Sequence, residues 1–274
     1  MNGSTIGSPA KGTIRLTLFV TWTLFSVAVF LICRPLSKVQ RTLIHWHHRV
    51  TCRIAGFRIE VRGVPRQEHP TLFACNHMSY FDIPILGALI DGCFIAKAEV
   101  RSWPVIGTMA KLQRSVFIER VARRAVEHRN ELVERLDGGD NLILFPEGTS
   151  SDGNGVLPFK SSLFAIAQSE VAGRPVVVQP VSIAYTKLDG MPLGRYLRPF
   201  FAWYGDMDLA SHLWQALALG RCTVVVEFHP PVTIVDFGSR KALSEHCQRV
   251  ATEGVAAAIS DRPTRRPESL ENAA

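Results

Sequence analysis

Residues 141–146 read NLILFP, and this stretch decides the fold class. The apolar run at residues 142–145 is uninterrupted and ends at Pro146. Such a run, closed by a turn residue, is typical of a strand that is buried on both faces of a parallel sheet. On either side of it, strand and helix patterns alternate along the chain, which indicates βαβ units. We therefore predict an α/β fold in which a largely parallel sheet is covered by helices on both faces.

The alternation of strand and helix patterns runs from residue 57 to residue 259. The predicted strands are residues 57–62, 71–75, 93–96, 115–118, 141–144, 176–185 and 223–228. The predicted helices are residues 83–90, 105–111, 121–136, 161–169, 209–219 and 241–259. No internal repeat and no long linker is visible in this part of the sequence. The pattern therefore predicts one domain over residues 55–260, followed by a polar, disordered tail at residues 261–274.

An apolar segment near the N-terminus, residues 16–33, reads LTLFVTWTLFSVAVFLIC. At about 1.5 Å per residue, this segment makes a helix about 27 Å long, close to the thickness of the hydrocarbon core of a bilayer. Basic residues are denser after the segment than before it, so the positive-inside rule predicts an inner-membrane anchor with the following domain in the cytoplasm. A cleaved secretory signal is the weaker alternative, because Arg34 and Pro35 follow directly and no small-residue cleavage site precedes them. The sequence leaves open whether the anchor spans the membrane or is monotopic.

Residues 36–54 predict a basic, aromatic-bearing helix at the membrane surface, so we group residues 1–54 as an anchoring unit. Within this helix, His45, His47 and His48 surround Trp46. Adjacent helix residues point in different directions and no carboxylate is close in sequence, which disfavours a metal site. We predict that these side chains pack at the membrane interface. We predict no metal and no organic cofactor for this chain.

The formal net charge is +7, from 31 basic and 24 acidic side chains. Such an excess suits anionic lipid head groups, an acidic protein partner or nucleic acid. Nucleic acid is disfavoured, because the basic residues are scattered and neither zinc-ligand spacing nor an aromatic RNA-binding signature is present. The six cysteines form no CxxC pair and lie in apolar segments, which is typical of reduced core residues in a reducing compartment.

The first candidate site is residues 76–82, NHMSYFD, directly after the predicted strand at residues 71–75. A histidine that acts as a general base needs a partner that holds one tautomer, so that the other ring nitrogen is free to take a proton. Asp82 follows His77 at a distance that a loop-to-helix turn can close. The alternative is that Asp82 only caps a helix and that His77 is an ordinary loop histidine. From this pair alone the alternative is favoured, because capping needs no catalytic partner, so the case for a general base depends on the other blocks.

The second candidate site is the turn after the strand at residues 141–144. Glu147, Gly148, Thr149 and Ser150 combine a carboxylate and small hydroxyls in a glycine-rich turn. Such a turn exposes backbone N–H groups that can bind an anion or a hydroxyl, so these residues are candidates for substrate binding. An ordinary surface turn is the alternative.

Three further positions complete the candidate set. Arg120 ends the block VFIER at residues 116–120, and its guanidinium suits a phosphate or a carboxylate, although a solvated helix start is the alternative. Lys97, directly after the predicted strand at residues 93–96, is a second basic candidate for substrate binding. Pro180 and Val181 lie in a predicted strand without ionisable groups, and we predict that they form an apolar wall for an acyl chain.

Taken together, these blocks resemble the glycerophospholipid acyltransferase family, in particular its bacterial 1-acylglycerol-3-phosphate acyltransferase type. That family has a His-x4-Asp block, a block that ends in Arg, a Phe-Pro-Glu-Gly block and a late Pro-containing block, in this order. The resemblance implies that His77 is the general base, that Asp82 orients it, and that Arg120 and the Glu147 loop bind the acceptor. It also implies an acyl thioester of acyl carrier protein or coenzyme A as donor, and a lyso-lipid as acceptor.

One departure from the family pattern concerns the acceptor. The family's third block commonly continues with an arginine assigned to the acceptor phosphate, and here that position is Ser150. The stretches FPEGTSSDGNGVLPFKSSLF and WYGDMDLASHLW are similar to the lyso-ornithine lipid O-acyltransferase branch, whose acceptor is a zwitterionic aminolipid. The resemblance therefore favours lyso-ornithine lipid, with lysophosphatidate as the alternative or second acceptor.

Two other classes of function remain to be compared. A membrane-anchored lipid-binding protein without activity would be expected to lose His77, Asp82 or Glu147 first, and all are present. A serine hydrolase of the α/β type needs a nucleophile elbow such as GxSxG, which the sequence lacks. Both are weaker than a lipid O-acyltransferase.

Overall fold

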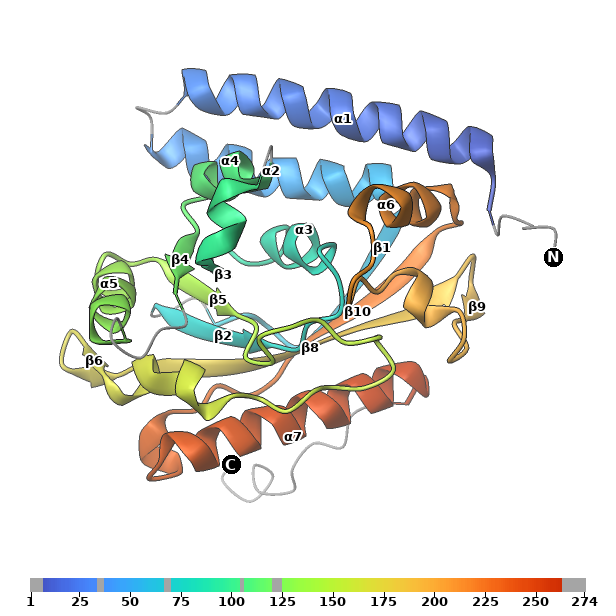
Figure 1. The fold of residues 1–274 in the computed structure, drawn as a ribbon. Helices are drawn as coiled ribbons and strands as arrows, with labels where there is room; N and C mark the ends of the chain where they lie inside the picture. Colours follow the sequence, from blue (N-terminus) through green and yellow to red (C-terminus); the bar gives the residue numbers. More distant parts are fainter. Residues whose placement is uncertain (1–6, 34–36, 67–69, 104–105, 120–124, 263–274) are drawn as a thin grey trace.

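A central sheet and two layers of helices make up the fold in the computed structural model, which describes residues 7–33, 37–66, 70–103, 106–119 and 125–262. In Figure 1, helices α1, α2, α3, α4 and α6 lie above the sheet, and the long helix α7 lies below it. The predicted α/β class with helices on both faces is thereby confirmed.

The main sheet has the strand order β1-β10-β8-β2-β5-β3-β4. Its strands are β1 (Phe57–Arg62), β2 (Thr71–Cys75), β3 (Gly92–Lys97), β4 (Val116–Ile118), β5 (Asn141–Leu144), β8 (Val177–Leu188) and β10 (Cys222–Phe228), and β9 (Met191–Pro192) pairs with β8. A separate hairpin consists of β6 (Glu170–Val171) and β7 (Arg174–Pro175). All pairings from β8 through β2, β5 and β3 to β4 are parallel, whereas β8 and β10 are antiparallel. The carboxyl ends of β2, β5, β3 and β4 therefore lie along one edge of the sheet.

The α-helices are α1 (Pro9–Ile32), α2 (Ser37–Ala55), α3 (Asp82–Gly87), α4 (Ile106–Leu112), α5 (Ala125–Asp137), α6 (Leu209–Ala218) and α7 (Arg240–Ile259). Shorter 3₁₀ segments are η1 (Ala98–Ser102), η3 (Ser161–Gln168), η4 (Arg198–Phe200) and η5 (Ile234–Asp236). The predicted helix at residues 161–169 is thus wrong in type. Its buried residues Phe164 and Ala167 are three positions apart, which matches the period of a 3₁₀ turn.

Two apolar layers follow from the alternation of side chains along the strands. On β2, Phe73 and Cys75 point to the layer that contains α2, α3 and α6, whereas Leu72 and Ala74 point to the layer that contains α5, η3 and α7. The central strands β2, β5 and β8 are buried on both faces. The core therefore fixes the ends of these strands, where the candidate site begins.

Helix α1 lies along the domain, where it contacts α6 near its start and α2 further along (Figure 1). Near its start, Arg15 Nη1 donates to the carbonyl oxygens of Leu217, at 3.3 Å, and Leu219, at 2.9 Å. Further along, Trp22 Nε1 donates to the carbonyl oxygen of His47 at 3.3 Å. The outward side carries exposed apolar side chains, namely Ile14, Leu18, Leu24, Phe25, Leu31 and Ile32. Among the described residues, α1 is the one helix long and apolar enough to cross a membrane.

The histidines of α2 lie further inside than the sequence predicted. His47 and His48 are 6% and 2% exposed. The Nδ1 atom of His47 is 2.9 Å from the hydroxyl of Ser26 on α1, and the His48 ring packs edge-on against Phe94 of β3. The prediction that these side chains pack at a membrane interface is therefore wrong for His47 and His48, since they join α2 to α1 and to the sheet.

Candidate active site

The loop between β2 and α3 brings His77 and Asp82 together. His77 Nδ1 lies 2.8 Å from Asp82 Oδ2, and the backbone N–H groups of Met78 and Ser79 donate to the same oxygen at 2.8 and 2.9 Å. Phe81, not Asp82, occupies the cap position of α3, so the carboxylate is not a helix cap. Because a carboxylate can only accept here, the hydrogen-bond network assigns the proton of the neutral imidazole to Nδ1 and the free electron pair to Nε2.

Burial separates the roles that the two side chains can have. The Asp82 side chain is 0% exposed, whereas that of His77 is 21% exposed. A buried carboxylate holds the ring from inside the protein, and the partly exposed ring can still meet a substrate. This arrangement suits a general base and its orienting partner.

Asn76, which precedes His77, and Tyr185 of β8 also hold the loop and the Asp82 carboxylate in place. The Asn76 side chain donates to the carbonyl oxygen of Ile183 at 3.0 Å and accepts from the N–H of Ile183 at 2.8 Å. Tyr185, two positions further along β8, donates from its hydroxyl to Asp82 Oδ1 at 3.0 Å. The sequence analysis named Asn76 only as the first residue of the candidate block, and it did not single out Tyr185. The alternation of side chains along the strand was the available signal, because it puts Val181, Ile183 and Tyr185 on one face.

The turn after β5 reaches the same place. Glu147 is buried, and its Oε1 accepts the backbone N–H of His77 at 2.9 Å, while the N–H of Ser151 donates to the carbonyl oxygen of His77 at 2.9 Å. Burial raises the pKa of Glu147 to about 8, against the opposing effect of the N–H groups of His77 and Leu157. Gly148 has φ 71°, a left-handed conformation that favours glycine and lets the chain turn sharply at this point. The two predicted blocks thus form one site.

Phe145 lies against the imidazole of His77. The ring centroids are 4.0 Å apart and the planes differ by 21°, so the rings are stacked. The contact fixes the plane of the imidazole, and the face of an aromatic ring attracts a cation. Phe145 therefore lies at the site. The sequence analysis placed it at the end of a strand and in the Phe-Pro-Glu-Gly block, but gave it no role of its own.

Ser150 connects the turn to a distant part of the chain. Its hydroxyl donates to the carbonyl oxygen of Trp203, and the N–H of Trp203 donates to the carbonyl oxygen of Met78 at 2.9 Å. Trp203 begins the stretch that, with the Ser150 turn, carries the resemblance to the lyso-ornithine lipid branch. The two stretches therefore meet beside the His77 loop.

The remaining predicted residues that the structure describes lie on the turn after β5, at the end of β3 and on β8. Thr149 is exposed, and Lys97 is exposed at the carboxyl end of β3, in register with Ile118 at the end of β4. Arg120 lies outside the described residues. Pro180 and Val181 are consecutive residues of β8, so their side chains point to opposite faces, and that of Val181 lies in the layer with α2, α3 and α6. Their predicted role as an acyl wall stays a prediction.

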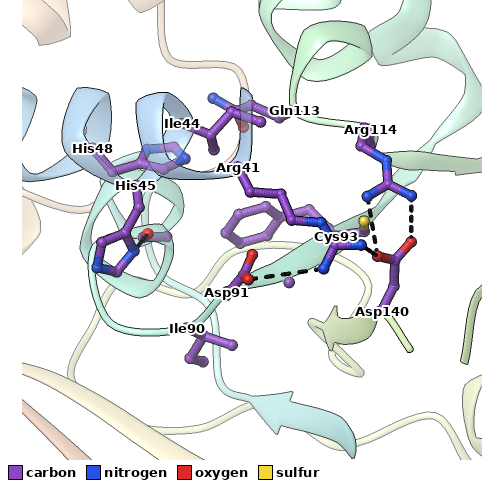
Figure 2. A pocket seen from close by; sticks show the side chains of 13 residues that line it. Arg41, Ile44, His45, His48, Ile90, Asp91, Cys93, Gln113, Arg114 and Asp140 are labelled. Carbon is purple, nitrogen blue, oxygen red and sulfur yellow. Dashed lines mark hydrogen bonds and ion pairs between the residues drawn. The ribbon is translucent and has the colours of Figure 1, made fainter. Parts of the chain in front are cut away.

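A separate cavity lies beside α2 and the starts of β3 and β5, at the opposite ends of the strands from His77. Figure 2 shows Arg41 and Arg114 around the carboxylate of Asp140, with Asp91 and the α2 histidines on the other side. Arg41 Nη2 and Arg114 Nη2 are each 2.7 Å from Asp140, and Arg135 Nη1 is 3.4 Å away. These ion pairs join α2, α5 and the segment between α4 and β4 to one buried carboxylate. We interpret it as structural.

The described residues contain no group of three or more histidine, cysteine, aspartate or glutamate side chains arranged to hold a metal ion. The side chains that the structure brings together at this site are the His77–Asp82 pair and the Glu147 turn. Such a pair suits proton transfer to and from a hydroxyl.

The chain is similar to known proteins over most of its length. Residues 58–184, which include β2, α3 and the Glu147 turn, match the model of the acyltransferase family. A lyso-ornithine lipid O-acyltransferase of Brucella abortus is 43% identical over 245 residues, which are 85% of this chain and 91% of that protein. The chain therefore belongs to the acyltransferase family.

Relatives of two kinds are similar to the chain. A lyso-ornithine lipid O-acyltransferase of Rhizobium meliloti is 41% identical, with 89% of this chain and 84% of that protein covered. A 1-acyl-sn-glycerol-3-phosphate acyltransferase of Neisseria gonorrhoeae is 36% identical, with 73% and 74% covered. The crystal structure of the 1-acyl-sn-glycerophosphate acyltransferase of Thermotoga maritima has the same fold, with a TM-score of 0.66 at 21% identity over 90% of this chain and 95% of that one.

Proposed function

We propose that this protein transfers a fatty acyl group from an acyl thioester to the hydroxyl of lyso-ornithine lipid, which gives ornithine lipid. The observation that carries the proposal is the similarity to the Brucella abortus enzyme over 91% of that enzyme's length. The structure adds a local reason. Ser150 replaces the arginine that the family uses for an acceptor phosphate, and its hydroxyl is already bonded to Trp203. An acceptor with a zwitterionic head group needs no such arginine.

The proposed reaction uses His77 and Asp82 as a unit. Nε2 of His77 takes the proton of the acceptor hydroxyl while its oxygen attacks the thioester carbonyl carbon. The new C–O ester bond forms, the C–S bond breaks, and the leaving thiolate takes the proton from the imidazolium. Asp82 holds Nδ1 throughout and stabilises the transient positive charge on the ring. No enzyme nucleophile is needed, because the acceptor oxygen itself attacks.

The Glu147 turn is the proposed acceptor-binding element. With its pKa raised to about 8, the Glu147 carboxyl is mostly protonated at neutral pH, so it can donate as well as accept a hydrogen bond. Gly148, Thr149 and Ser150 follow it in the same turn. Lys97 and Arg120 follow β3 and β4, whose carboxyl ends lie at the same edge of the sheet as His77. We propose that these two cations contact the anionic parts of either substrate.

A second acceptor, lysophosphatidate, is favoured by a different observation. The Neisseria gonorrhoeae enzyme that is 36% identical to this chain is a 1-acyl-sn-glycerol-3-phosphate acyltransferase. The same His77–Asp82 chemistry serves both acceptors, because both present a hydroxyl. Acceptor choice therefore rests on the turn around Ser150 and not on the base.

For the donor, we propose acyl carrier protein or coenzyme A. Both are anionic, and the +7 charge of the chain is compatible with either. A purified enzyme supplied with each donor in turn would distinguish them.

We further propose that the domain works at the cytoplasmic face of the inner membrane. The exposed apolar side of α1 makes a large apolar surface next to α2, which a membrane would cover. Basic residues are denser after the apolar segment than before it, which favours a cytoplasmic domain.

One experiment tests the proposed function directly. Membranes from a host that makes lyso-ornithine lipid, but not ornithine lipid, are compared with and without this protein by lipid analysis. Accumulation of ornithine lipid at the expense of the lyso-lipid is the expected result. Accumulation of phosphatidic acid alone, with lyso-ornithine lipid unchanged, would favour the second acceptor instead.

A further inference from the structure

Tyr185 reaches the active site from the neighbouring strand β8, on the face of the sheet that α3 covers. It lies on β8, 103 residues from Asp82 in sequence, and its hydroxyl donates to Asp82 Oδ1 at 3.0 Å. The side chain is 0% exposed. Burial among apolar groups raises the pKa of the phenol well above its usual value, so the hydroxyl keeps its proton and can act as a donor.

The fold holds this hydroxyl in place. The last residue of β8 that pairs with β2 is Val181, so β8 continues past the end of β2 and runs under the loop that carries His77. The Tyr185 ring is 5.8 Å from the rings of both Phe57 and Phe201, edge-on to the first and stacked on the second. These contacts leave the phenol little freedom to turn away from Asp82.

The two oxygens of Asp82 have different partners. Oδ2 accepts from His77 Nδ1 and from two backbone N–H groups. Among the described residues, Tyr185 provides the one hydrogen bond to Oδ1. A buried carboxylate oxygen without a donor is costly, so the loss of this bond would favour rotation of the carboxylate toward the backbone donors. Rotation would weaken the bond to His77.

We propose that Tyr185 is a positioning residue that fixes the rotation of the Asp82 carboxylate, and through it the orientation and tautomer of His77. The proposal rests on the proposed role of His77 as general base. Tyr185 does not touch the substrate, so its loss lowers the rate of acyl transfer without weakening the binding of the lyso-lipid.

The test is the variant Tyr185→Phe, which removes one oxygen and keeps the ring packing. A hydrogen bond to a charged group is worth about 1.5–3 kcal/mol, so kcat falls about 10- to 100-fold with KM for the lyso-lipid unchanged. In protein with isotope-labelled histidine, the Nδ1 proton resonance of His77 shifts or broadens. The matched control is Thr186→Val, which removes a buried hydroxyl from the next residue of β8. That hydroxyl donates to the carbonyl oxygen of Thr223 at 3.2 Å, so Asp82 is untouched.

The outcomes separate the possible roles. A fall in kcat with a changed His77 resonance in the Tyr185 variant, and neither in the Thr186 variant, supports the proposal. An unchanged kcat overturns it, and so does a fall in kcat with an unchanged His77 resonance. If Tyr185→Phe does not fold, fluorotyrosine at this position changes the donor strength instead, and an unchanged kcat again overturns the proposal. The comparison uses whichever acceptor the wild-type enzyme acylates, so a wrong choice of lipid does not affect it.

Discussion

The imidazole of His77 is stacked on the ring of Phe145, with centroids 4.0 Å apart and planes that differ by 21°. His77 follows β2 and Phe145 follows β5, and these strands are paired in parallel. The stack therefore depends on two adjacent strands that end at the same edge of the sheet. It supports the imidazole from one face while Asp82 holds its Nδ1 edge.

The stack predicts an effect of Phe145→Leu on acyl transfer. The aromatic face stabilises the imidazolium that forms during proton transfer, by about 0.5–2 kcal/mol. Replacement by leucine keeps apolar bulk but removes the ring, so kcat falls about 2- to 30-fold with little change in KM. Steady-state kinetics with a labelled acyl donor measure it. Phe159→Leu is the control, since it removes a buried ring from the opposite layer, and equal losses of kcat in both variants would contradict this role.

The raised pKa of Glu147 predicts how stability depends on pH. Folding raises this pKa from 4.5 to about 8, so the folded state binds the proton more tightly than the unfolded state. The stabilisation is fully present below about pH 4.5 and is lost as the pH rises through about 8, by as much as about 5 kcal/mol. Denaturant unfolding at several pH values measures this loss.

Glu147→Gln removes this titration but keeps the size of the side chain. The difference in unfolding free energy between wild type and variant should therefore change steadily between about pH 5 and about pH 8. Parallel curves for the two proteins over this range would show that Glu147 is not the titrating group.

Ser150→Arg predicts a change in acceptor preference. An arginine at this position supplies the forked donor that suits a phosphate, so the ratio of kcat/KM for lysophosphatidate to that for lyso-ornithine lipid rises about tenfold or more. Ser150→Ala is the control, because it loses the bond to Trp203 without adding charge. If both variants change the ratio equally, the effect belongs to the lost bond and the argument about the phosphate fails.

We predict that Asp140→Asn, at a position remote from the active site, lowers the stability of the fold. It leaves Arg41, Arg114 and Arg135 around a neutral group. Removal of one partner of a buried ion pair costs about 3–5 kcal/mol, and the partial exposure of the arginines reduces this to about 2 kcal/mol. Unfolding in detergent micelles measures it. Asp91→Asn is the control, since that carboxylate is 67% exposed, and an equal loss there would contradict the structural role of Asp140.

The part of the site that lies at the ends of β2 and β5 could be predicted from the sequence. His77 and Asp82 are separated by one loop between a strand and a helix, and the strands at residues 71–75 and 141–144 were predicted to the residue. Both strands are short apolar runs with polar turns after them, which is the clearest strand signal in a single sequence. The parallel pairing of these strands then brings the Glu147 turn to His77.

The contacts that residues far along the chain make with the site could not be predicted in the same way. Tyr185 and Trp203 meet the His77 loop through the length of β8 and the path of the chain after it, which local patterns do not report. In sequence, His47 and His48 look like polar residues of a surface helix. Their burial depends on α1, which packs over α2. The segment at residues 161–169 packs against α7, a contact between distant parts of the chain that helix propensity does not report.

The central claim is that His77 is the general base of acyl transfer. The direct measurement is the rate of transfer of a labelled acyl group to lyso-ornithine lipid by wild type and by His77→Ala, with binding of the lyso-lipid measured in parallel. The account predicts a loss of about 10²- to 10⁴-fold in the rate with binding retained. A rate for the variant within about threefold of wild type would contradict it.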